Sequence, residues 1–150
     1  MNLEIQTIKK SIDIDAPKEK VWEVLLLDKY TLRWYAAFSP GSHAETDWQI
    51  GSKAIFKDNS NEGLVGTIVV NRPAEVISID YQGVVSKGQE DYDSDLAQAI
   101  NGCCETYRLL DKDGLTQLAI NLDMGAEYFD IMSAAWDKAL QQIKEFSEAN

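Results

Sequence analysis

Three polar residues of this 150-residue chain, Glu105, His43 and Tyr107, carry side chains capable of chemistry. Alternation along a strand expected over 103–110 puts Glu105 on the same face as Tyr107, turned toward a long C-terminal helix. A carboxylate on that face must be hydrogen-bonded, paired or protonated. It would then anchor a polar ligand group or act as a general acid or base. A register shift or a bulge at Gly102 would instead turn Glu105 outward, and the sequence leaves both alternatives open.

His43 is the single histidine of the chain. Any Ser-His-Asp or Cys-His arrangement would have to include it. It falls on a weak strand after a short helix, and we interpret it as a structural histidine; in the fold that the chain resembles (below), this position lies near the cavity mouth. We therefore assign no catalytic residue. An enzyme of the cyclase or hydrolase type, using Glu105, His43 or Tyr107, is the least favoured interpretation.

Neither a metal nor a cofactor is expected. Zinc needs three or four nitrogen, sulfur or carboxylate ligands, which one histidine and the adjacent Cys103 and Cys104 cannot easily supply. Aspartates alternate over 91–95 as in a calcium loop. However, Leu96 and Gly102 stand where that loop requires glycine and glutamate. The sequence also contains no glycine-rich phosphate loop.

The aromatic residues exceed what a thin two-layer core requires, although each taken singly is more often a core residue. Ligand cavities are lined by such side chains together with a few polar groups. We therefore predict a cavity under the C-terminal helix, with Glu105 as its polar floor. The predicted lining consists of Trp34, Tyr35, Phe38, His43, Phe56, Tyr107, Phe129, Met132 and Trp136.

The first elements that would position these residues follow from the spacing of apolar side chains. Alternating isoleucines predict a strand over 5–15. A helix over 17–26 opens on Pro17, whose missing N–H costs nothing in a first helical turn. Asp28 is expected to cap a second short helix over 29–36.

Later strands are predicted where apolar residues alternate between turn signals. They cover 42–48, 53–58, 64–71, 75–82, 103–110 and 115–122. The segment 84–101 is interpreted as an acidic insertion. We expect its part 86–100 to form a mobile lid that ends in a short helix over 96–100.

The clearest element is a helix over 127–147, because its apolar residues recur three or four positions apart. Its apolar face is expected against the concave side of the sheet and includes Phe129, Met132, Trp136, Leu140 and Ile143. Strands followed by segregated helices indicate an α+β fold. We predict a curved antiparallel sheet of about six or seven strands around this helix, with two short helices after the first strand.

Length and charge narrow the classes of partner. The chain, residues 1–150, has the size of one domain. Its 25 acidic and 14 basic residues give a net charge of −11, which argues against nucleic acid and anionic membranes as partners. No apolar run reaches the length of a membrane span. Adjacent cysteines argue against a disulfide framework, so we expect a cytoplasmic location.

The layout resembles the START-like, or SRPBCC, superfamily with its helix-grip fold. Local motifs resemble the branch named after the activator of the heat-shock-protein-90 ATPase. That branch reads acid-Ala-Pro-x-x-x-Val-Trp at its first helix, as at 15–22 here, and has a Trp-aromatic pair, as at 34–35. A Gly-x-x-x-x-Phe stretch at 51–56, a Gly-to-Pro segment at 66–73 and a hairpin at 106–118 complete the resemblance.

This resemblance implies a fold used by lipid carriers, hormone receptors, polyketide cyclases, stress proteins and co-chaperone modules. The favoured function is binding of an unidentified small hydrophobic or amphipathic molecule in an internal cavity. The alternative from another class is a co-chaperone-like module that acts through a protein partner or as a homodimer. A roomy cavity would favour the first and a filled core with an exposed apolar patch the second.

Overall fold

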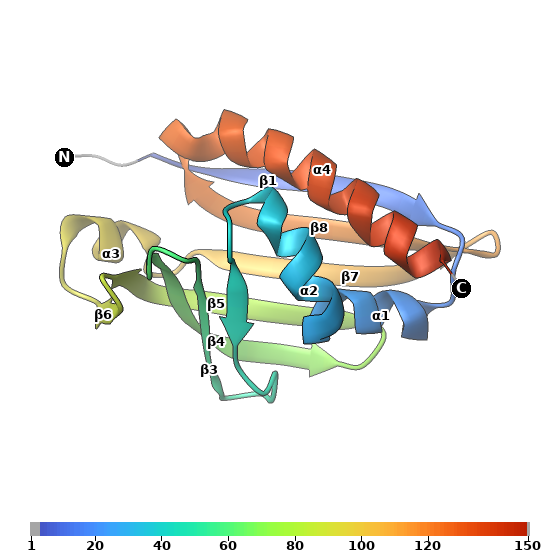
Figure 1. The fold of residues 1–150 in the computed structure, drawn as a ribbon, viewed down its shortest axis with the longest axis horizontal. Coiled ribbons are helices and arrows are strands. Elements are labelled where there is room, and N and C mark those ends of the chain that lie inside the picture. The colour runs from blue at the N-terminus through green and yellow to red at the C-terminus, as the bar shows by residue number, and fades with distance from the viewer. Residues whose placement is uncertain (1–3, 150) are drawn as a thin grey trace.

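The computed structural model describes residues 4–149 (Figure 1). Most of its strands follow one another along the chain, and its longest helix comes last. The strands are β1 (Ile5–Ile14), β2 (His43–Glu45), β3 (Lys53–Lys57), β4 (Gly63–Arg72), β5 (Val76–Ser86), β6 (Gln89–Asp91), β7 (Cys104–Lys112) and β8 (Leu115–Gly125). The helices are α1 (Lys18–Leu26), α2 (Asp28–Trp34), α3 (Asp95–Ile100) and α4 (Phe129–Glu148), with short 3-10 turns η1 (Tyr35–Ala37) and η2 (Ala126–Tyr128). None of the helices in this described range is long and apolar enough to cross a membrane.

All strands belong to one sheet in which every pair is antiparallel. Its order is β1-β8-β7-β5-β4-β3-β2, and the short β6 pairs with β5 off this path. The predicted α+β helix-grip architecture is therefore confirmed. The sheet has eight strands, where about six or seven were predicted. The additional strand is β6, which comes from the acidic segment for which no strand was predicted.

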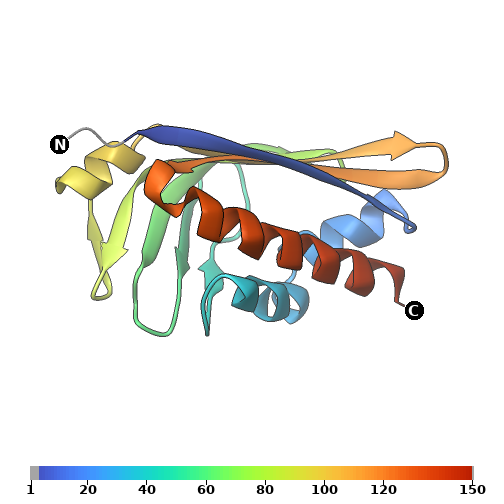
Figure 2. The ribbon, with the colours of Figure 1, turned by 90° about the horizontal axis from the view of Figure 1, so that it is seen from above.

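The sheet bends where β4 meets β5. Their pairing shifts register between Val65 and Gly66 and again between Ile68 and Val70. Such bulges increase the local twist and bend the strand. Gly66 fits this close approach, since a Cβ there would lie 2.5 Å from the Asp80 carbonyl oxygen. Figure 2 shows the consequence, as β3 and β4 curve away from the layer formed by β1 and β8.

α4 crosses the concave side of this sheet beside α2 (Figures 1 and 2). Its residues Trp136, Ala139, Leu140 and Ile143 are buried, as the helical spacing predicts. Met132, nearer the start of the helix, is only half-buried. The C-terminal part of α4 is therefore packed closely against the core, while its N-terminal part borders open space.

A single residue, Leu27, separates the two short helices α1 and α2. Pro17 caps α1, and its carbonyl oxygen accepts the N–H groups of Lys20 and Val21 at 3.0 and 3.2 Å. The predicted cap of the second helix is wrong. Leu27 is both the C-cap of α1 and the N-cap of α2, so Asp28 already lies in the first helical turn. There its negative carboxylate interacts favourably with the positive end of the helix dipole.

The acidic segment lies between β5 and β7 and consists of the end of β5, the strand β6 and the helix α3. β5 runs on to Ser86, beyond its predicted end at 82, because Val84 and Val85 are buried on the sheet. The sequence pattern does not show this continuation, because Gly83 interrupts the strand and glycine weakens a strand interior. Ser94 caps α3 by accepting the Ala97 N–H at 3.2 Å. The mobility of 86–100 stays a prediction.

Replacing Trp136 with alanine should lower the free energy of unfolding by about 3–5 kcal/mol, since this tryptophan is 2% exposed. Chemical denaturation of the variant and the wild type measures the difference. Lys138→Ala, on the exposed side of the same helix, is the matched control and should change stability by less than about 0.5 kcal/mol. A loss below about 1 kcal/mol for Trp136→Ala would show that its packing contributes little.

Candidate ligand-binding site

An apolar cavity of about 210 Å³, which we call the inner chamber, lies between the bent sheet and the helices α2 and α4. Aromatic side chains dominate its wall, with polar residues gathered toward the β2–β3–β4 side. Its lining comprises Trp34, Tyr35, Phe38, Ser42, His43, Phe56, Lys57, Asp58, Glu62, Gly63, Leu64, Tyr81, Glu105, Tyr107, Leu122, Met132 and Trp136.

Trp136 is the centre of the aromatic packing. Its ring centroid lies 5.0 Å from that of Phe38, 5.7 Å from Tyr107 and 5.9 Å from Trp34. These separations are those of favourable aromatic pairs. The buried Nε1–H of Trp136 has no acceptor among the described residues. A bound polar group that accepts a hydrogen bond from this N–H would remove the cost of leaving a buried donor unpaired.

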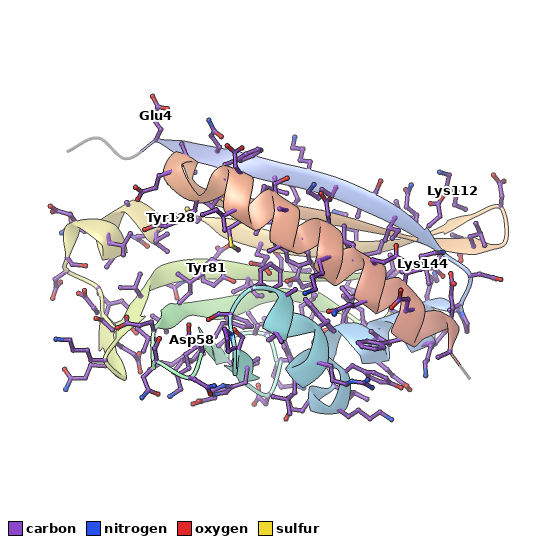
Figure 3. All side chains as sticks on the ribbon, turned by 45° about the horizontal axis from the view of Figure 1, so that its top comes forward. Glu4, Asp58, Tyr81, Lys112, Tyr128 and Lys144 are labelled. Carbon is purple, nitrogen blue, oxygen red and sulfur yellow. The ribbon has the colours of Figure 1, made fainter. Side chains whose placement is uncertain are left out.

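A second cavity of about 750 Å³, the acidic chamber, opens beside the inner one toward β6 and α3. The two chambers share lining residues, among them Tyr81, Glu105, Leu122 and Met132, so they adjoin each other at these side chains. In Figure 3 the labelled Tyr81 lies between Tyr128, at the start of α4, and Asp58, just after β3. Tyr128 and Asp58 both line the acidic chamber.

Glu105 lies where the two chambers meet. It is on β7 and turns to the concave side, so the outward alternative left open by the sequence does not occur. Tyr81 on β5 donates its hydroxyl to Glu105 Oε1 at 2.9 Å, and Tyr107 on the same strand as Glu105 donates to Oε2. The carboxylate is thus held by two tyrosines within an apolar wall.

Burial sets the protonation of this cluster. Desolvation raises the pKa of Glu105 above its ordinary value, while the hydroxyls of Tyr107 and Tyr81 oppose the shift by stabilising the ionised form. Burial, followed by the charge of Glu105, also raises the pKa of Tyr107 and of Tyr81 well above the ordinary range. The pKa of Tyr35 is raised for the same reasons. All three phenols are therefore neutral at physiological pH.

His43 lies on the rim of the inner chamber with both ring nitrogens engaged. Nδ1 is 3.0 Å from the Gly41 carbonyl oxygen, and Nε2 is 2.9 Å from Glu45 Oε2. Both partners are acceptors, so they favour the doubly protonated ring and raise the pKa of His43, the Gly41 contact most strongly. Lys57, also on this rim, pairs with Glu45 at 3.2 Å.

Most of the residues proposed from the sequence meet around the inner chamber. Nine of the ten named there line it: Trp34, Tyr35, Phe38, His43, Phe56, Glu105, Tyr107, Met132 and Trp136. Phe129 does not; it packs against the main core cluster. Helical side chains lean toward the N-terminus, which carries this first residue of α4 past the end of the chamber. Binding by the other nine stays a prediction.

Sequence reasoning missed Tyr81 and the acidic chamber. Within the strand predicted over 75–82, Tyr81 alternates onto the same face as Ile77 and Ile79, so the sequence pattern is sufficient to indicate its inward direction. Its contact with Glu105 was not, because the pairing of β5 with β7 joins segments separated by β6 and α3. Among residues 4–149, no three histidine, cysteine or acidic side chains converge closely enough to hold a metal ion.

A comparison with protein-family models finds none that matches the chain, and a comparison with curated proteins finds no match either. Solved structures do match. The Aha1 dimer from Colwellia psychrerythraea superposes with a TM-score of 0.72 at 15% identity, covering 95% of this chain and 96% of that one. CalU16 from Micromonospora echinospora gives a TM-score of 0.66 at 18% identity, covering 97% and 78%.

DynU16, described as a putative protein in the dynemicin biosynthetic locus, gives a TM-score of 0.69 at 13% identity. The match covers 95% of this chain and 47% of DynU16. At such identities the similarity shows the fold. The chain has the helix-grip fold of START-like, or SRPBCC, proteins, and its resemblance to the branch of the heat-shock-protein ATPase activator is confirmed at that level.

Glu105→Gln should change how stability depends on pH. Because the folded state raises the pKa of Glu105 above its ordinary 4.5, it holds the proton more tightly than the unfolded chain. Between those two pKa values unfolding releases a proton, so the free energy of unfolding falls as pH rises. This contribution is absent in Glu105→Gln, and the wild type should lose stability relative to the variant as pH rises from 4.5 toward neutrality.

Urea denaturation of both proteins over this pH range measures the difference. The exposed substitution Glu23→Gln on α1 removes a carboxyl outside both chambers and should not reproduce the trend. A difference between wild type and Glu105→Gln that is constant, or that favours the wild type increasingly with pH, would show that the carboxyl is ionised at no cost in the folded protein.

Proposed function

We propose that this protein binds a small amphipathic molecule in the two adjoining chambers. The apolar body of the ligand would lie against the aromatic wall around Trp136, and its polar group would meet Glu105. The observation that carries this proposal is the position of Glu105, a carboxylate held at the junction of an apolar cavity. Apolar pockets with a few convergent polar groups are the usual form of small-molecule sites.

The size of the cavity supports this function. The acidic chamber alone, at about 750 Å³, has the volume of a site for a drug-sized ligand, which is about 300–1,000 Å³. The inner chamber adds further space for a ligand, lined mainly by aromatic side chains. Leu122 and Met132, which line both chambers, offer a ligand apolar surface to bury.

The polar groups suit binding better than catalysis. Tyr81 and Tyr107 already donate their hydroxyls to Glu105, so the cluster presents one carboxylate acceptor instead of a nucleophile with its base. His43 has both nitrogens engaged on the rim. We therefore favour a carrier or receptor over a cyclase- or hydrolase-type enzyme.

A protein partner is the second candidate, favoured by exposed apolar side chains at one end of the molecule. Ile5, Tyr128 and Ile131 are 42%, 48% and 70% exposed. They belong to the beginnings of β1 and α4 and to η2 between β8 and α4. The matched Aha1 structure is described as a dimer. Sedimentation at several concentrations tests self-association, and a monomer throughout would remove a homodimer from consideration.

Net charge sets further expectations of the same proposal. A net charge of −11 disfavours nucleic-acid and anionic-membrane binding, which counterion release from basic contacts drives, so we expect neither partner. A cytoplasmic location fits this composition.

The uncharged apolar dye Nile red should bind the wild type, changing tryptophan fluorescence and raising the melting temperature. Dye at about 100 times its dissociation constant stabilises the folded state by about 2.7 kcal/mol. Met132→Trp should fill the space shared by the chambers and abolish both responses. The matched control is Ile131→Trp, one position away on the exposed side of α4, which should retain them.

Circular dichroism of both variants checks that they fold. If the wild type responds to neither Nile red nor other chemically varied amphiphiles, ligand binding in the cavity is disproved. Equal loss of dye binding in Met132→Trp and Ile131→Trp would likewise show that the dye binds elsewhere.

A further inference from the structure

The acidic chamber is lined by charge of a single sign. Five acidic residues are among its lining, Asp58, Glu62, Asp91, Glu105 and Asp123, and no lysine, arginine or histidine is. Asp123 turns its carboxylate to the opposite face of the sheet, where it accepts the Thr7 hydroxyl, so the other four supply the charge. Those four come from three separate segments: the turn between β3 and β4, β6 and β7. Only the folded chain gathers them, so no acidic run in the sequence marks the chamber.

This negative charge is not cancelled by basic side chains. None of the five forms an ion pair with a lysine, arginine or histidine of residues 4–149. Their protein partners are neutral donors. Asp58 accepts the Ser39 hydroxyl at 2.7 Å, and Asp123 accepts the backbone N–H of Cys104 at 3.1 Å. The hydroxyls of Ser60 and Ser39 lower the pKa of Asp58 to about 2, so this carboxylate keeps its charge without a basic partner.

Most of the rest of the wall is apolar, which strengthens the effect of this charge. Val84, Ile100, Leu122 and Met124 line the chamber together with Met132. Clefts with walls of low dielectric constant and charges of one sign focus the field on what enters them. An anionic group would be repelled there, and a neutral one would gain nothing from the field.

We propose that the ligand is a cationic amphiphile, an amine-bearing molecule whose positive group lies at Glu105 and the acidic chamber and whose apolar body fills the inner chamber. This inference rests on the proposed function and names its ligand class. The only basic groups of the cavity, Lys57 and His43, lie on the rim of the inner chamber, where both contact Glu45. Asp58, Glu62 and Glu105 line both chambers, but the inner chamber also has these two basic groups and most of the aromatic wall, so we place the positive head toward the acidic chamber.

Glu105 can accept the ligand without releasing its tyrosines. A carboxylate offers about four acceptor sites, and Tyr81 and Tyr107 occupy one on each oxygen. The aromatic faces of the adjoining wall add attraction for a cation that lies over them. An organic cation fits better than a metal ion, because no three of the described ligand-type side chains converge on one point.

Three probes of equal chain length test the head-group preference: decylamine, decanol and decanoate, each below its micelle concentration at neutral pH. Competition with Nile red gives the dissociation constants. Decylamine should bind at least about tenfold more tightly than decanol, because hydrogen bonds to charged groups contribute about 1.5–3 kcal/mol and 1.4 kcal/mol is tenfold. Decanoate should bind most weakly.

Glu105→Gln should remove most of the preference for decylamine over decanol while leaving decanol affinity within about twofold. Because that variant alters a buried cluster, Glu62→Gln provides a second test on the exposed edge of the acidic chamber, and it should reduce the preference several-fold. Glu23→Gln removes the same unit of charge from α1 outside the cavity and should leave the preference unchanged.

The outcomes separate this inference from the function on which it rests. Failure of all three probes to bind would overturn both. Binding of decanol or decanoate as tight as that of decylamine would overturn the cationic ligand and leave the amphiphile site standing. A decylamine preference that persists in Glu105→Gln and Glu62→Gln would also overturn the inference, since the acidic chamber would not be its source.

Discussion

The packing of α4 against only one half of a bent sheet is the constraint on which the rest of this structure depends. The helix is held along its C-terminal part, where Leu140 and Ile143 are buried. The other half of the sheet curves away because β4 and β5 are paired through bulges next to Gly66. The space between the helix and the curved half cannot be closed by the same contacts, and both chambers lie there.

A cavity of this kind can hold a carboxylate only if the protein compensates its desolvation. Glu105 is compensated by Tyr81 and Tyr107, two neutral donors that leave its charge exposed to whatever enters the cavity. A lysine in their place would have neutralised the site. Because burial still raises the pKa of Glu105, holding a carboxyl group in this apolar wall costs stability even with both tyrosine hydrogen bonds.

Much of the inner chamber was predictable because it depends on local periodicity. The spacing in α4 predicted that Met132 and Trp136 share a face, and strand alternation predicted an inward Glu105 as one of two alternatives. Phe129 was misplaced because the exact start of a helix decides whether its first side chain reaches the cavity. The continuation of β5 was missed because Gly83 resembles a strand end until β6 is seen to pair beyond it.

Residue types at short spacing predicted the class of fold and the amphipathic faces, and the composition gives the net negative charge. The contact between Tyr81 and Glu105, and the meeting of acidic residues from separate segments around one chamber, arise only in the folded chain. Those contacts depend on strand register and on the bend between β4 and β5, which are set by long-range pairing. Local patterns cannot encode such pairing, because residues far apart in the chain become neighbours only when the sheet closes around α4.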